Sequence, residues 1–328
     1  MQFDDILYGK ITIKNPIIQS IVATDAFQRL KEINQYGGVN FLYKDSYQTT
    51  RFEHSIGVWH ILATVGASIE VQIAGLIHDI GHAAFSHMVD HVLTDEDFHH
   101  DSAHLLPGIA EVHNIIEKAG VTLKNDLDDY TEIKAKLPLV GADRIDYAMR
   151  DYYAVIGHKE GFGKSVLNNL ILQNGKILFT DPTICREFAL DGTDALTELV
   201  YAPEIAPIYA ALMKMIDQGL QKEIIARQDL FLTDKGLFNK LMNARDQLDQ
   251  TSIKIFEEKF RVESGTQQDH DFFQTSDKLR YFDPELFIDG EIKTLSKIDP
   301  EFKDTFEIKV QEIHQRQKGE YFKVIFEN

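Results

Sequence analysis

The sequence has little cysteine and no long apolar run. Its single cysteine, Cys185, excludes an intramolecular disulfide and fits a reducing compartment. Apolar neighbours at Ile184 and Phe188 indicate a buried structural thiol. No run of 18 apolar residues occurs, and the N-terminus MQFDDILYGK has neither the basic nor the apolar region of a signal peptide. We therefore expect a cytoplasmic protein that does not enter a membrane.

Positive charge is also scarce. The chain has 34 Lys and Arg against 52 Asp and Glu, a net charge of −18. Nucleic-acid binding without sequence preference depends on Lys and Arg that neutralise phosphates, so we do not expect a nucleic-acid partner. A small phosphorylated substrate needs only a locally positive pocket, which metal ions and a few basic side chains can form inside an acidic shell.

Length and periodicity predict a mainly α protein with more than one part. The 328 residues exceed the usual 100 to 200 of one domain. Asn174-Gly175 between two apolar runs predicts a β-hairpin with a type I′ turn, followed by helices to about residue 260. In the tail, EIKVQEI and YFKVIF alternate like strands. We expect a core of residues 1–160, an extension of 161–265 and a small C-terminal α+β region of 266–328.

Histidine is concentrated in one part of the chain. Ten of the thirteen histidines lie between His54 and His113, a clustering that a metal site requires. The dipeptide His78-Asp79 follows an apolar helical run, and adjacent helical side chains, about 100° apart, can both reach an ion beside the helix. His54, 24 residues earlier, and Asp143, at a predicted helix start, are candidate further ligands. Imidazole and carboxylate suit Mn, Mg, Fe, Ni or Zn, so we expect a divalent metal cofactor.

More polar side chains follow the dipeptide. His82, His87 and Asp90 stand among small residues that let the backbone pass close to the site. Any one of them could be a satisfied surface or core residue, but five titratable groups in thirteen positions favour a functional cluster. His60, beside Trp59 on a different helix face, is interpreted as structural.

Four segments together carry a family resemblance. They are GKITIKNPIIQSIVATDAFQRLKEINQYGG, RFEHS, HDIGHAAFSHMVD and ADRIDYAMRD. From about residue 3 to about residue 160 the chain resembles the HD-domain metal-dependent phosphohydrolases, specifically their deoxynucleoside triphosphate triphosphohydrolase branch. The resemblance implies an HD-domain helical core, to which the β-hairpin is an insertion and the C-terminal region an appendage.

The resemblance also implies roles for single residues. The implied metal ligands are His54, His78, Asp79 and Asp143. Within FHHDSAH it places His100, next to His99, as the catalytic proton donor; Asp90 would hold its second ring nitrogen, and His82 completes the catalytic group. The implied substrate-binding residues are Arg51, His87, Arg144, Tyr147, Asp151, Gln35 and Tyr209. The chain departs from the branch at Tyr36, where the branch has Leu, and at Tyr201, the position of an Arg if Tyr209 is the pocket tyrosine.

The implied reaction is hydrolysis of a (deoxy)nucleoside triphosphate to nucleoside and inorganic triphosphate by a metal-activated water. One alternative keeps the metal site but acts on another nucleotide: a monophosphate, a cyclic dinucleotide or (p)ppGpp. A second alternative is a nucleotide-binding HD scaffold without catalysis. The branch includes oligomers, so a homo-oligomer is also considered, although this chain is shorter than they are.

Overall fold

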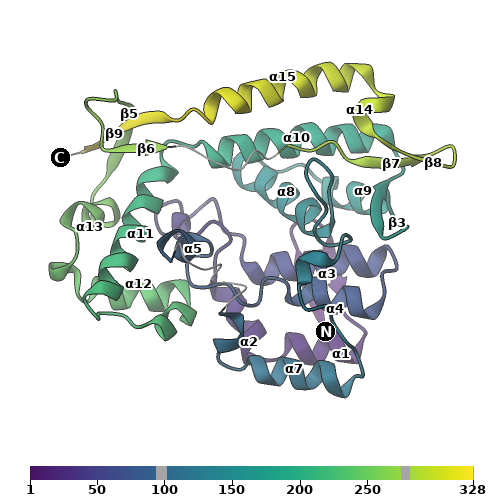
Figure 1. Ribbon diagram of the computed structural model, residues 1–328, viewed down its shortest axis with the longest axis horizontal. Helices are drawn as coiled ribbons and strands as arrows, with labels where there is room; N and C mark the ends of the chain where they lie inside the picture. The colour runs from purple at the N-terminus through teal and green to yellow at the C-terminus, as the bar shows by residue number, and fades with distance from the viewer. Residues whose placement is uncertain (94–101, 275–280, 328) are drawn as a thin grey trace.

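The structure, a computed structural model, describes residues 1–93, 102–274 and 281–327. Helices dominate it, which confirms the predicted mainly α fold (Figure 1). The α-helices are α1 (Pro16–Val22), α2 (Asp25–Gln28), α3 (Arg51–Thr64), α4 (Ile69–Ile77), α5 (Met88–Val92), α7 (Ile109–Lys118), α8 (Ala142–Val155), α9 (Phe162–Asn168), α10 (Pro182–Val200), α11 (Ile205–Gln221), α12 (Asp234–Met242), α13 (Gln250–Glu257), α14 (Leu295–Ile298) and α15 (Pro300–Arg316). The strands are β1 (Gln2–Asp5), β2 (Gly9–Thr12), β3 (Leu170–Gln173), β4 (Lys176–Phe179), β5 (Phe260–Ser264), β6 (Phe272–Gln274), β7 (Glu285–Ile288), β8 (Glu291–Thr294) and β9 (Glu320–Phe326).

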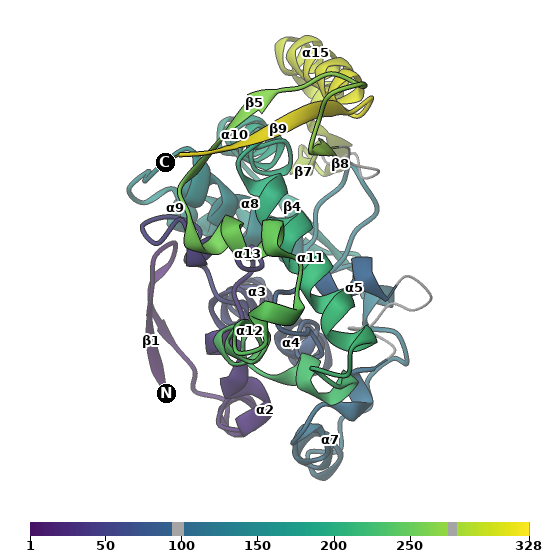
Figure 2. The same ribbon diagram turned by 90° about the vertical axis from the view of Figure 1, so that its left-hand side faces the viewer.

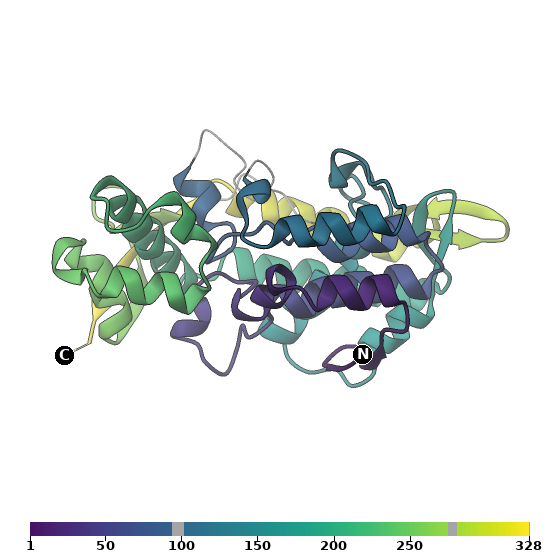
Figure 3. The same ribbon diagram turned by 90° about the horizontal axis from the view of Figure 1, so that it is seen from below.

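Helices α3, α4 and α8 form the centre of the helical core. Helix α3 packs against both α4 and α8, and α8 also packs against α10. On one face of the molecule, α1 and α7 lie side by side (Figure 3). The antiparallel hairpin of β1 and β2 runs along one side, near the N-terminus (Figure 2). The candidate metal ligands thus come from helices that pack on one another.

Local sequence explains where α3 begins and why α8 approaches it so closely. Thr50 and Glu53 form a reciprocal capping box, in which each side chain accepts a hydrogen bond from the backbone N–H of the other residue. One turn further, a Cβ atom added at Gly57 would lie 1.9 Å from Oδ1 of Asp146 and 2.6 Å from Nη2 of Arg150. Only glycine at residue 57 leaves room for the polar side chains of α8.

In the described part of the chain, three small sheets accompany the helices. The predicted hairpin of β3 and β4 is confirmed, with positive φ at Asn174 (53°) and Gly175 (71°) as its tight turn requires. Strand β7 pairs in parallel with β4, and β8 extends the sheet to the order β3-β4-β7-β8. The third sheet has the order β5-β9-β6. Two sheets therefore contain strands from both sides of the boundary at residues 265 and 266; the division into three parts stays a prediction.

One prediction for the tail is wrong. The segment EIKVQEI, residues 307–313, lies inside α15 and not in a strand, whereas YFKVIF lies in β9 as expected. Helix α15 begins with Asp299 as N-cap, whose side chain accepts from the backbone N–H of Phe302 at 2.8 Å, and with Pro300 in its first turn. Seven residues that alternate between apolar and polar are also compatible with a helix. The capping residue, the proline in the first turn and the burial of Phe302 and Ile313 favour the helix here.

The burial of the single cysteine and the length of the apolar helices bear on two predictions from the sequence. Cys185 is completely buried, as its apolar neighbours predict. Within the three described segments, no single helix has both the length and the apolar character needed to cross a membrane. Helices α10 and α11 reach that threshold only as a pair bent by 55°, and only by length and composition.

Candidate metal centre

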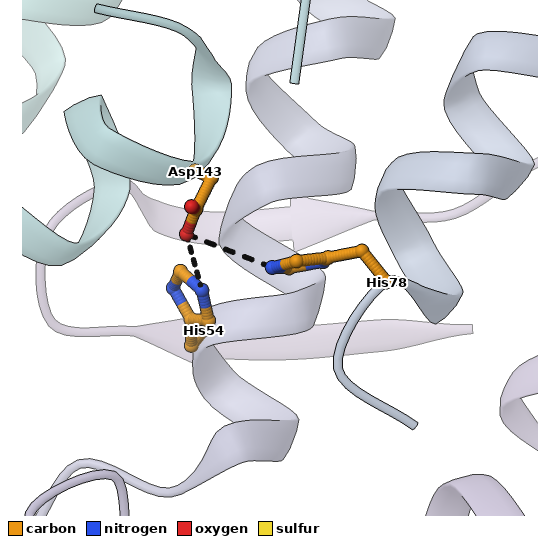
Figure 4. Close-up of side chains that lie close together, drawn as sticks. All are labelled: His54, His78 and Asp143. Atoms are coloured by element: carbon orange, nitrogen blue, oxygen red, sulfur yellow. Dashed lines mark hydrogen bonds and ion pairs between the residues drawn. The ribbon is translucent and has the colours of Figure 1, made fainter. Parts of the chain in front are cut away.

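Three helix ends bring candidate metal ligands together (Figure 4). His54 lies in the first turn of α3, His78 directly follows α4, and Asp143 lies in the first turn of α8. Oδ1 of Asp143 is 3.1 Å from Nε2 of His54 and 3.6 Å from Nε2 of His78. Nitrogen and oxygen ligands bind such metals at about 2.1 Å, so atoms up to about 4 Å apart can share one ion. These separations fit a common cation.

Asp79, the fourth predicted ligand, lies beside this group and is also held by Arg51. Its Oδ1 is 3.3 Å from Nε2 of His78, and its Oδ2 is 3.6 Å from Nε2 of His54. The Arg51 guanidinium forms an ion pair with Oδ2. Burial acts to raise the pKa of Asp79, but the charges of Arg51 and His78 outweigh it and hold this pKa well below its usual value. The carboxylate is therefore ionised and can serve as a further ligand.

Hydrogen bonds orient both imidazole rings toward Asp143. Nδ1 of His78 donates to the carbonyl oxygen of Gly75, and Nδ1 of His54 donates to Oδ2 of Asp146, each at 2.8 Å. A neutral ring that donates through Nδ1 has its lone pair on Nε2. Nε2 of His78 is buried and makes no hydrogen bond within the described part of the chain. Such an atom is costly unless it has a ligand, and therefore these residues fit a divalent cation.

The electrostatics of the cluster favour a positive charge. Burial lowers the pKa of His54, but hydrogen bonds to Asp143 and Asp146 outweigh this effect and raise it to about 9. The hydrogen bond to His54 and the nearby ring of His78 in turn overcome the effect of burial on Asp143 and lower its pKa. The carboxylates thus stabilise positive charge at the His54 ring, and a metal ion can take the place of the proton.

A buried network that the sequence analysis did not identify supports His54. Asp146 accepts from Nδ1 of His54 at 2.8 Å, from Nε of Arg150 at 2.7 Å and from the hydroxyl of Tyr8 at 2.8 Å. Arg150 also donates to Asp5 at 2.9 Å. Asp146 and Arg150 lie four residues apart on α8, but their partners in the N-terminal hairpin have no signal in the sequence. This network fixes the orientation of the His54 ring.

Of the predicted catalytic residues, His82 lies next to the cluster. His82 is buried, with Nδ1 3.5 Å from Oδ1 of Asp79 and its ring 4.8 Å from the ring of His87. The side chain of His87 is 47% exposed, and its Nδ1 lies 3.1 Å from Oδ2 of Asp90. The predicted contact of Asp90 is with His100, which lies outside the described residues together with its neighbours at 94–101. The roles of His82, Asp90 and His100 stay predictions.

The predicted substrate-binding residues divide into two groups. Asp151 is buried, and its charge adds to burial in raising the pKa of Tyr36 and of Tyr209. The Tyr209 hydroxyl donates to the carbonyl oxygen of Tyr36 at 3.0 Å, and Tyr36 follows Gln35. These residues lie together near Arg51, whose charge acts on Tyr209.

Arg144 and Tyr147 make different contacts. The guanidinium of Arg144 donates to the carbonyl oxygens of Ala135 and, at 2.7 Å, of Leu139. The Tyr147 ring lies 6.4 Å from that of Phe282. In this structure the Arg144 side chain holds the segment that precedes α8, and its predicted contact with phosphate remains a prediction.

A buried carboxylate outside the predicted site also binds this region. Asp234, in the first turn of α12, is 4% exposed. Its Oδ1 accepts from the backbone N–H of Phe85 at 2.7 Å, and its Oδ2 accepts from that of Asn34 at 2.8 Å. Burial raises the pKa of Asp234 to about 6, although both hydrogen bonds act to lower it. Asp234 thus connects α12 to the segments that flank the metal centre.

The comparisons with known proteins agree with this geometry. The family model of the HD domain matches residues 51–134. The uncharacterized protein YdhJ of Bacillus subtilis is 30% identical over 339 residues, which cover 99% of each chain. Metal-dependent phosphohydrolase cns2 of Cordyceps militaris is 34% identical over 156 residues, 45% of this chain and 44% of that protein. Deoxynucleoside triphosphate triphosphohydrolase SAMHD1 of Xenopus laevis is 32% identical over 161 residues, 41% of this chain and 24% of that protein.

The chain belongs to the HD-domain metal-dependent phosphohydrolases. The matched range of this phosphohydrolase contains Arg51, His54, His78 and Asp79, whereas Asp143 lies beyond its end. Of the three converging candidate ligands, two therefore belong to the shared domain segment, and the third lies in the helix that follows it.

We expect Asp146→Asn to weaken metal binding by the phosphohydrolase roughly 10- to 100-fold, because partners that orient a ligating histidine contribute about this much to affinity. The two carboxylate oxygens of Asp146 share several donors, whereas the amide of asparagine has only one acceptor oxygen. The ring of His54 is then no longer held in one orientation. Mn²⁺ affinity measured by electron paramagnetic resonance checks this. Tyr8→Phe removes a different donor to Asp146 and leaves its contact with His54, and we expect it to keep affinity near that of the wild type.

The pKa of Asp234 predicts a pH dependence of stability. Its folded pKa of about 6 exceeds the ordinary value of 3.8. The stabilising contribution is therefore complete below about pH 4 and is lost as the pH rises through about 6. Relative to Asp234→Asn, which does not titrate, the wild type should lose about 2.4 kcal/mol of unfolding free energy between about pH 4 and about pH 7.5. Urea titrations of both proteins at the two pH values measure this; a constant difference would contradict it.

Proposed function

We propose that this phosphohydrolase converts a nucleoside triphosphate and water into nucleoside and inorganic triphosphate, with deoxynucleoside triphosphates as the preferred class. The proposal is carried by the convergence of His54, His78 and Asp143 from three helix ends, with Asp79 beside them. Support for the substrate class comes from the relative in Xenopus laevis, whose name states this activity and whose similarity spans 41% of this chain.

The proposed ligands are His54, His78, Asp79 and Asp143. When bound, a divalent ion supplies a water molecule of lowered pKa and neutralises phosphate charge. The chain's own groups then bind and orient the substrate. Arg51 lies at the edge of the cluster, and His82 and His87 extend from it toward the surface. A phosphate oxygen that accepts from such charged donors is held by about 1.5 to 3 kcal/mol for each bond.

The proton for the leaving sugar oxygen is assigned to His100. An imidazole with an ordinary pKa near 6.5 is suited to general acid catalysis close to neutral pH. Gln35, Tyr36 and Tyr209 are assigned to the sugar end of the substrate. The side chain of Tyr36 is larger than the leucine that the triphosphohydrolase branch has at this position. We therefore expect a narrower sugar pocket that accepts fewer nucleosides.

A product assay tests the proposal. The panel contains deoxynucleoside and ribonucleoside triphosphates, a monophosphate, a cyclic dinucleotide and (p)ppGpp, each with Mn²⁺, Mg²⁺, Fe²⁺, Ni²⁺ or Zn²⁺, and a sample with chelator is the control. Inorganic triphosphate and nucleoside in equal amounts are the expected products. Release of orthophosphate or pyrophosphate from the same triphosphates would overturn the assignment, and binding without turnover would favour a scaffold.

A further inference from the structure

The side chain of Asp234 does not cap its own helix, α12. The N-cap of α12 is Thr233, whose Oγ1 accepts from the backbone N–H of Gly236 at 3.1 Å. Both carboxylate oxygens of Asp234 point instead to backbone N–H groups 149 and 200 residues away in sequence, those of Phe85 and Asn34. A carboxylate buried to this extent is costly unless it is hydrogen-bonded, and these two contacts join two segments remote in sequence to the start of α12.

The segment that Asp234 holds has a strained backbone. Phe85 and Ser86 have φ angles of 63° and 56°, in the left-handed region that side chains with a Cβ atom rarely adopt. The backbone N–H of the preceding Ala84 donates to the carbonyl oxygen of Leu230 at 2.8 Å. Two consecutive N–H groups are thus bound by the segment around the start of α12. A strained turn persists where its surroundings fix it in this way.

Ser86 connects this turn to the metal centre. Its Oγ donates to the carbonyl oxygen of Asn34 at 2.6 Å and accepts from Nε of Arg51 at 2.9 Å. Nη1 of Arg51 in turn forms the ion pair with Asp79. The turn at residues 85 and 86 therefore decides where Ser86 places the guanidinium, and the guanidinium holds the carboxylate that flanks His54 and His78.

Arg29 reinforces the same connection. Its Nε donates to the carbonyl oxygen of Phe231 at 2.6 Å, and its Nη1 donates to that of His82 at 2.9 Å. One guanidinium thus bridges the segment before α12 and the segment that carries the predicted catalytic histidine. The contacts at His82 and Phe85 thus fix the chain just before and at the start of the strained turn.

We propose that Asp234 is a positioning residue of the metal centre, which acts through the Phe85-Ser86 turn and Arg51 on Asp79. The extension that contains α12 then contributes to the chemistry of the HD core, although it lies outside the range that matches the family model. This inference rests on the proposed metal site, and its test measures metal affinity as well as turnover.

The experiment compares four full-length variants with the wild type. Asp234→Asn keeps the shape but has one acceptor for two N–H groups, and Ser86→Ala removes the contact with Arg51. We expect each to lower Mn²⁺ affinity roughly tenfold, as loss of a supporting partner does. The double variant should lose no more Mn²⁺ affinity than the single variant with the larger loss, because both changes break the same connection.

Asp229→Asn is the matched control. Asp229 lies five residues before Asp234, where it accepts from the backbone N–H of Ala226 at 2.7 Å and pairs with Lys240; its hydrogen bonds and ion pairs among the described residues do not include residues 82–86. We expect wild-type Mn²⁺ affinity from this variant. Wild-type affinity in Asp234→Asn, or losses that multiply in the double variant, would overturn the proposal. If Asp234→Asn does not fold, Ser86→Ala decides alone: unchanged affinity there would refute the connection.

Turnover of deoxynucleoside triphosphates with saturating Mn²⁺ separates this proposal from the proposed function. Asp234→Asn should lower kcat, because a displaced Asp79 carboxylate changes the reacting centre. If the wild type binds Mn²⁺ but releases no triphosphate, the substrate assignment fails while the affinity comparison still tests Asp234.

Discussion

Replacing His78 with alanine is expected to remove the bound metal and to reduce turnover at least about a thousandfold. The ion contributes several kcal/mol of charge stabilisation to phosphoryl hydrolysis, and each 1.4 kcal/mol is about a factor of ten in rate. Nε2 of His78 is buried and makes no hydrogen bond among the described residues, so truncation removes a candidate metal ligand; it also removes the contact of Nδ1 with the carbonyl oxygen of Gly75. Metal content after dialysis and turnover with a nucleotide panel measure the two effects.

His60→Ala is the control for this experiment. His60 lies on α3, as His54 does, but its ring is 5.4 Å from that of Tyr8 in an edge-on contact. Burial lowers its pKa, as expected for a neutral packing residue. We expect this variant to retain its metal. Wild-type metal content in His78→Ala would show that the assigned centre is wrong, and loss of metal in both variants would show only a damaged fold.

Arg150→Met is expected to lower the free energy of unfolding by about 3 to 5 kcal/mol, the usual effect of removing one partner from a buried ion pair. Arg150 is 2% exposed and is enclosed by Asp146 and Asp5. Methionine fills much of the same volume, but both carboxylates then remain in the core without their cation. The urea concentration at the unfolding midpoint, together with the slope of the transition, gives the change.

Arg186 provides the comparison for Arg150. It also contacts two carboxylates, Asp299 and Glu301, but its side chain is 30% exposed and one partner is at the surface. Water screens such pairs, so we expect a much smaller loss of stability from Arg186→Met. Equal losses in the two variants would mean that burial does not determine the effect.

The candidate ligands of this centre could be predicted because they belong to short sequence motifs. His54, His78 and Asp143 each stand at a helix end, and residue type and spacing are enough to nominate them. Their supports could not be predicted in this way. Asp146 and Arg150 form an ordinary i, i+4 pair on a helix, and only the docking of the N-terminal hairpin turns that pair into a buried network.

The role of Asp234 could not be predicted from the sequence either. An aspartate in the first turn of a helix is explained by helix capping and the helix dipole alone, so it carries no functional signal in the sequence. Its partners at Asn34 and Phe85 appear only when α12 lies against the core. The error at residues 307–313 has a local origin, because a short alternating pattern does not distinguish a strand from a half-buried helix.

The two sheets that combine strands from distant parts of the chain have a consequence for shortened forms of the protein. A chain that stopped after residue 265 would keep β4 and β5 but would lack β7 and β9, with which these strands pair. Their backbone N–H and C=O groups would then form open edges, which recruit strands from other molecules and lead to aggregation. Insolubility of such a fragment would therefore reflect uncovered strands and would say nothing about the integrity of the catalytic helices.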